Sequence, residues 1–244
     1  MRSIAAAVLI VAGMTATAHA GRSYYGWLYG VEVLPERSVE LQTWVLERDN
    51  LGDAHRKVTS WWIGPLVGVT DQLELAFPVE TRWLVADGMN PSYTFERYGA
   101  ELRYRFVTQD PVDAPAFAPL GRLAVKRDVT SRDATVLEAD LVAAYESGRF
   151  HALADAGFFG EISGDRGNHF EMRPGAGISI RAVEDLRFGV EGYGEISMDS
   201  AGDTWFAAGP NLAWTHGRFW LSAAYGIGIT GIKAAPRFMW GVLF

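Results

Sequence analysis

The chain contains no cysteine among its 244 residues. A disulfide framework, a thiolate metal site and a cysteine nucleophile are therefore excluded. Basic residues are also scarce, since 22 Lys and Arg stand against 29 Asp and Glu, which gives a net charge of −7. Nucleic-acid binding depends on basic surface. We therefore expect no nucleic-acid partner.

Long apolar runs are missing beyond Ala20, where no segment reaches the length of about 18 residues expected of a membrane-spanning helix. The first 20 residues have the three parts of a secretory signal peptide: the basic Arg2, a short apolar stretch over residues 4–14, and the cleavage motif Ala18-His19-Ala20. The sequence therefore predicts export, with residues 1–20 as the signal peptide.

From Ser38 onward the chain is a series of segments, each about ten residues long, in which apolar and polar residues alternate. One face of each segment is almost entirely apolar and often has an aromatic residue near an end, as in Phe150 and Phe158. A soluble sandwich or lipocalin-like barrel also alternates. Apolar faces bounded by aromatics instead favour the lipid-facing wall of a transmembrane antiparallel up-and-down β-barrel, which is all-β.

The connections between these segments alternate between longer polar loops and tight turns, with residues 108–115 as a longer, proline-containing exception among the turns. Six longer loops imply twelve strands, with ten or fourteen as alternatives. In membrane barrels the longer loops are extracellular and the tight turns periplasmic. A lead-in over residues 21–37, periplasmic or entering the lumen, precedes a barrel over residues 38–244. The predicted strands are 38–48, 57–69, 73–83, 93–107, 116–127, 134–146, 149–160, 169–182, 186–198, 204–215, 218–229 and 237–244.

Two short segments carry a resemblance to a known class. Phe238, Trp240, Val242 and Phe244 alternate at the end of the chain, and this ending resembles the last strand of Gram-negative outer-membrane barrels. The stretch 33–41 resembles the opening of uncharacterised transporter-like or porin-like barrels. The resemblance implies a place in the cell outer membrane, contact with outer-membrane lipid, and Phe244 as part of the signal read by the barrel assembly machinery.

The alternation directs charged side chains of both signs into the predicted lumen, because a charge in hydrocarbon costs several kcal/mol. We predict passive passage or binding of small solutes through this charge-lined lumen, the solute being unknown. A plugged structural or adhesion barrel is the alternative. The candidate lining residues are Glu80, Arg82, Arg97, Glu101, Arg103, Arg105, Glu138, Asp140, Asp155, Glu171, Arg173, Arg187 and Glu191.

A barrel enzyme is a distant third hypothesis. Outer-membrane phospholipases and lipid-A deacylases carry a His-x-Ser pair, and none of the five histidines has serine two residues later. Omptin-type proteases combine Asp-x-Asp with Asp-x-His; Asp53 and His55 match the second pair, but the first occurs nowhere. The sequence also lacks phosphate-loop, zinc and EF-hand patterns. We expect no catalytic residue, no cofactor and no metal site.

Overall fold

The computed structural model describes residues 23–51, 56–110, 112, 114–130, 134–164, 167–199 and 202–244. The predicted signal peptide and His55 lie outside the described residues. In the described part of the chain, no helix is long and apolar enough to cross a membrane.

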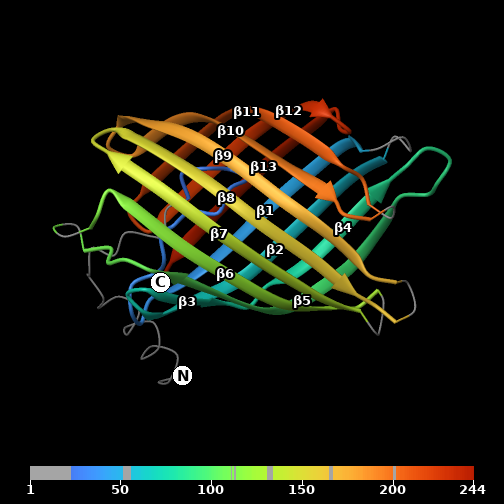
Figure 1. Cartoon of the computed structure of the whole chain (residues 1–244), viewed down its shortest axis with the longest axis horizontal. Coiled ribbons are helices and arrows are strands. Elements are labelled where there is room, and N and C mark those ends of the chain that lie inside the picture. Colours follow the sequence, from blue (N-terminus) through green and yellow to red (C-terminus); the bar gives the residue numbers. More distant parts are fainter. Residues whose placement is uncertain are drawn as a thin grey trace, which may run out of the picture.

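The described chain is built of antiparallel strands (Figure 1). Their bounds agree with the predicted strands to within a few residues. The strands are β1 (Val39–Leu51), β2 (Arg56–Thr70), β3 (Leu73–Ala76), β4 (Val79–Val85), β5 (Ser92–Arg105), β6 (Phe117–Asp128), β7 (Thr135–Ser147), β8 (Phe150–Ile162), β9 (His169–Val183), β10 (Leu186–Ser197), β11 (Trp205–His216), β12 (Phe219–Thr230) and β13 (Ala234–Leu243).

The sheet closes on itself, because β1 pairs with β13 on one side and with β2 on the other. β3 and β4 occupy a single position in the ring, since each pairs with both β2 and β5. They are separated at Phe77 and Pro78, where proline has no backbone N–H to donate to the ladder. The predicted barrel of twelve strands is therefore confirmed, with one strand split in two.

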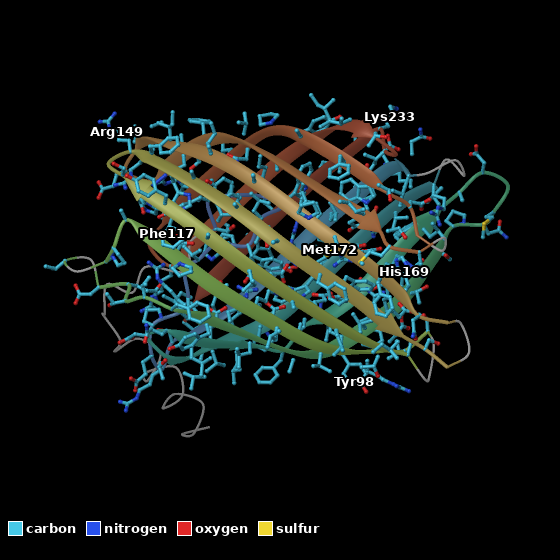
Figure 2. The ribbon with its side chains drawn as sticks, in the orientation of Figure 1. Tyr98, Phe117, Arg149, His169, Met172 and Lys233 are labelled. Carbon is cyan, nitrogen blue, oxygen red and sulfur yellow. The ribbon has the colours of Figure 1, made fainter. Side chains whose placement is uncertain are left out.

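The outer wall of the barrel is apolar. Leu141 is 69% exposed and Ile229 is 70% exposed, and large apolar side chains recur at alternate positions on most strands. Figure 2 shows Tyr98 and Phe117 projecting from the outer surface. Charged side chains at the intervening positions, such as Glu101 and Arg103, are buried. This inverts the arrangement of a soluble barrel and suits a wall surrounded by lipid.

The two ends of the barrel differ. Tight turns with a glycine at positive φ, at Gly148 and Gly217, connect strands at one end, which we call the turn end. Most of the longer connections, such as the projecting one between β4 and β5, lie at the opposite, loop end (Figure 1), whereas the connection between β5 and β6, residues 106–116, is a longer one at the turn end. Figure 2 shows Arg149 at the turn end and His169 and Lys233 at the loop end.

Residues 23–34, the lumen segment, form no strand and pack inside the ring, and residues 35–37, of which Glu36 and Arg37 are exposed, connect the segment to β1. Tyr25, Leu28 and Leu34 are at most 1% exposed, and their neighbours in the three apolar clusters come from strands around the barrel. Of the stretch predicted as a lead-in, residues 23–34 therefore lie in the lumen and fill its middle.

Candidate functional site

The centre of the lumen is a network of ion pairs around Arg122 on β6. Its guanidinium lies 2.6 Å from a carboxylate oxygen of each of Glu101, Glu138 and Asp140. Its side chain is only 1% exposed. A buried cation is stable only when its charge and its N–H groups are matched. Three carboxylates from β5 and β7 match the charge and bind the two terminal nitrogens, while Nε has no hydrogen-bond partner among the described residues, and the carboxylates tie neighbouring strands together.

The network extends towards both ends of the barrel. On the loop side, Lys126 contacts Glu138 at 2.9 Å and Glu80 at 2.5 Å. On the turn side, Glu101 also accepts from Arg103, whose other ion pair is with Glu74 at 3.2 Å. Carboxylates and cations therefore alternate along the inner face of β3 to β7.

A cavity of about 330 Å³ occupies the loop end of the lumen, which we call the loop-end cavity. Its lining includes Arg48, Arg82, Glu96, Glu195 and Asp203, and aromatic side chains contribute as well. The ion pair between Arg82 and Glu96 measures 3.0 Å, and Arg48 lies 3.1 Å from Glu195. Cations and carboxylates are interspersed, so the lining does not carry a field of one sign.

Two arginines flank one aromatic ring in this cavity. The guanidinium carbon of Arg173 lies 4.2 Å from the ring centroid of Phe159, and that of Arg97 lies 5.2 Å away. Arg173 is fixed by Glu171 at 2.8 Å. Arg97 has carboxylates around it only at 3.5–3.8 Å, from Glu80, Glu96, Asp128 and Glu161. Arg97 is thus held by several long contacts and not by one short ion pair.

A second cavity of about 300 Å³ lies at the turn end, which we call the turn-end cavity. Tyr24, Glu32, Arg105, Glu146 and His151 contribute to its lining. The lumen segment supplies part of the lining of both cavities, through Trp27 and Tyr29 at the loop end and Glu32 at the turn end. The segment therefore lies between the two cavities.

Charged groups of the wall hold the lumen segment by its backbone. The Glu191 carboxylate accepts the backbone N–H groups of Gly26, Trp27 and Leu28 at 2.6–3.2 Å. Three successive N–H groups directed at one anion form the kind of concavity that binds anions. Glu74 accepts the N–H of Leu34 at 2.8 Å.

Arginines bind the carbonyl groups of the same segment. Arg237 donates to the Trp27 carbonyl and Arg105 donates to the Val31 carbonyl, both at 2.9 Å. The Gln109 side chain accepts from the N–H of Val33 and donates to its carbonyl. Hydrogen bonds of this kind to charged groups contribute about 1.5–3 kcal/mol each, so the segment is firmly attached.

Glycines on the inner face leave space for the segment's side chains. A Cβ atom at Gly226 would lie 1.7 Å from the indole of Trp27, and one at Gly175 would lie 2.2 Å from Leu28. A Cβ atom at Gly177 would lie 2.6 Å from the ring of Tyr25, whose hydroxyl is 2.9 Å from Nδ1 of His151. β9 and β12 are therefore shaped to fit these side chains.

The structure places the predicted lining residues in several groups. Glu80, Arg82, Arg97, Glu171 and Arg173 line the loop-end cavity, as do Glu138 and Asp140 at its base. Glu101 and Arg103 belong to the central network. The three arginines of β5 are thus spread from one end to the other. The remaining four contact or adjoin the lumen segment: Arg105 (Val31 carbonyl), Asp155 (backbone of Tyr29), Arg187 (4.0 Å from the Tyr24 ring) and Glu191.

Sequence reasoning missed Glu96 and Arg237. Glu96 is the unpaired residue of a β-bulge, because Glu80 pairs with Arg97 while Thr81 pairs with Phe95. Strict alternation from Arg97 would therefore place Glu96 on the outer face, whereas both Glu96 and Arg97 line the cavity. Arg237 lies within the predicted last strand, and its alternation with Phe238 would have revealed it. Within the described residues, no group of His, Asp and Glu side chains is arranged to hold a metal ion.

Comparison with known proteins finds similar structures but no similar sequences. No family model matches the chain, and no curated protein matches it. Among solved structures, an outer membrane channel from Pseudomonas putida F1 superposes with a TM-score of 0.62 at 10% identity, over 89% of this chain and 99% of that chain.

Two further structures are similar. The β domain of the Bordetella autotransporter Brka gives a TM-score of 0.57 at 10% identity, covering 85% of this chain and 99% of that one. The NanC porin gives 0.52 at 10% identity, covering 84% and 98%. These identities are too low to transfer a solute or a partner. The chain has the fold of the outer-membrane β-barrels, and porins and channels are among its structural neighbours.

Proposed function

We propose that this protein is an outer-membrane channel for the passive passage of small polar solutes, closed in this structure by the lumen segment. The observation that carries the proposal is the position of the segment between two charge-lined cavities at opposite ends of one barrel. The wall continues past the segment on all sides, so its displacement would join the two cavities.

The cavities indicate the size and polarity of the solute. Volumes of about 330 and 300 Å³ suit small molecules and not folded proteins. Because carboxylates and cations alternate in the lining, a solute bearing groups of both signs finds partners for each. The apolar exterior and the likeness to outer-membrane channels support the outer membrane as the location.

The alternative is a permanently plugged structural barrel, favoured by the hydrogen bonds that Glu191 and Arg237 make to the segment. Single-channel recording in planar bilayers distinguishes the two. We expect small and rare openings from the complete protein and steady conductance from a variant lacking residues 23–34, which precede β1. If that variant forms a heat-modifiable barrel and does not conduct, the channel proposal is wrong.

A further inference from the structure

Four charged side chains of the inner wall bind the backbone of the lumen segment, so these contacts do not depend on the segment's own side chains. Glu191 and Glu74 accept backbone N–H groups, and Arg237 and Arg105 donate to backbone carbonyls. These four residues come from β10, β3, β13 and β5, so the backbone is bound from several sides of the ring. Donors and acceptors of a main chain are both matched, which is the pattern of peptide recognition.

We propose that the inner wall is a binding site for a peptide main chain, bent where it meets Glu191, and that the lumen segment is its intramolecular ligand. Short unstructured peptides would then be the solutes that displace the segment and pass. This inference rests on the proposed channel function and adds the chemical class of the solute.

The Glu191 contact is the most specific part of this site. One carboxylate accepts three successive N–H groups, from residues 26 to 28. A peptide backbone presents such a row of donors, whereas a sugar presents hydroxyl groups and a carboxylic acid presents acceptors. Glu191 is 2% exposed, and a buried carboxylate that loses its donors is strongly unfavourable. When the segment leaves, water or another main chain must supply these donors, and a main chain supplies them as one row.

Arg105 and Arg237 favour the same class of ligand. Within the described part of the chain, no carboxylate oxygen lies within 4.0 Å of either guanidinium. Each donates instead to a carbonyl of the segment. If the segment leaves, both cations lose a carbonyl acceptor, and a peptide carbonyl restores it.

The segment has an advantage over a free peptide, because it is joined to β1 by the short link 35–38. Tethering of this kind gives an effective concentration in the millimolar range. A competing peptide must therefore be supplied at millimolar concentration, and its effect is best measured as exposure of the segment.

The natural chain has no cysteine, so one introduced thiol reports on the segment alone. Leu28 is 1% exposed and Val33 is 3% exposed. In Leu28→Cys, reaction with a maleimide requires the segment to leave the wall, and the reaction rate measures that event. Val33→Cys is the second reporter, for use if Leu28→Cys lowers the yield of folded barrel.

The probe is a capped hexapeptide of glycine and alanine at 5–10 mM, on the scale of the tether's effective concentration of about 1 mM or more. The same hexapeptide N-methylated at alternate residues has nearly the same size and fewer N–H donors. We expect the first peptide to accelerate labelling at least about tenfold and the second to leave the rate unchanged. Equal acceleration by both, or by neither, would overturn the peptide assignment.

Glu191→Gln tests the wall. Loss of the carboxylate charge should raise the rate of labelling, measured in the absence of peptide, by about tenfold. This factor corresponds to the lower end of the stabilisation that a hydrogen bond to a charged group provides. The control, Glu47→Gln, removes a surface carboxylate that contacts Lys57 and not the segment, and should leave the rate unchanged. An unchanged rate in Glu191→Gln would contradict the proposal.

The two proposals fail differently. If the variant lacking residues 23–34 conducts and labelling of the complete protein does not respond to the peptide, the channel proposal stands and peptides are rejected as its solutes. If labelling responds to the peptide but neither the complete protein nor the deletion variant conducts, the peptide-binding site stands and the channel proposal is rejected.

Discussion

The phenol ring of Tyr29 lies over the guanidinium of Arg122, with 4.2 Å between the guanidinium carbon and the ring centroid. A residue of the lumen segment thus covers the cation on which three wall carboxylates converge. Cation–π contacts of this type contribute about 0.5–2 kcal/mol. The closed state of the lumen and the stability of the wall are therefore linked at this pair.

Replacement of Arg122 by glutamine should destabilise the barrel strongly. Glu101, Glu138 and Asp140 would remain buried after losing their shared cation. Breaking a buried ion pair in this way costs about 3–5 kcal/mol. The measurement is the temperature at which the compact band is lost in heat-modification gels.

Arg82→Gln is the matched control for that prediction. Its side chain is 38% exposed and has one ion pair, with Glu96, so the loss should stay below about 1 kcal/mol. A comparable fall in both variants would contradict the central role of Arg122.

A single methyl group at Gly226 should loosen the lumen segment. The Cβ atom would lie 1.7 Å from the indole of Trp27, so the ring must move. We expect Gly226→Ala to keep a heat-modifiable barrel and to increase the frequency of channel openings. Gly121→Ala is the comparison, because its Cβ atom would make an ordinary contact of 3.5 Å with Phe106. Equal opening frequencies in the two variants would mean that the fit of Trp27 does not control closure.

Arg97 should influence ion selectivity once the lumen is open. It stands among four carboxylates in the loop-end cavity, and removal of its charge leaves that part of the cavity more negative. In the variant lacking residues 23–34, Arg97→Gln should shift the reversal potential in a KCl gradient towards cation preference. Arg37→Gln, whose side chain is 87% exposed, should cause no shift. A reversal potential unaffected by Arg97→Gln would remove this residue from the conduction path.

The loop end is expected to face outwards, because longer loops are extracellular in membrane barrels. In the cysteine-free chain, Asp87→Cys should react with a membrane-impermeant maleimide in whole cells. Arg149→Cys, in the tight turn between β7 and β8, should react only after the outer membrane is permeabilised. The reverse pattern would show the opposite orientation.

The strands were predictable because lipid on one side and a polar lumen on the other impose a period of two along each strand. That period determines whether a side chain faces the lumen or the lipid, but it does not determine which residue the side chain contacts. Arg97, Arg103 and Arg105 share one face of β5, yet they contact carboxylates of the loop-end cavity, the central network and a backbone carbonyl respectively. The partners depend on the register between strands and on the curvature of the ring.

The lumen segment was less predictable for a different reason. Its hydrogen bonds run through its own backbone to Glu191 and Arg105, and backbone groups leave no trace in residue type. The glycines at 175, 177 and 226 are the available signal, but glycine is common in barrels of this kind and does not by itself identify a packed partner. Glu96 was not predicted because it lies in a β-bulge, which adds one residue and interrupts the alternation.

The pairing of β1 with β13 joins the first and last described strands, so the seam of the ring is completed last along the chain. The lumen segment is connected to β1 at the turn end, where Arg37 bonds to the backbone of Gly68. If the segment settles before the seam forms, the ring closes around it. If it settles later, it must enter past Arg105 and Gln109, and under the proposed channel function a newly inserted barrel would stay open until it does. The order of these two events would then set how long each new barrel is an open pore.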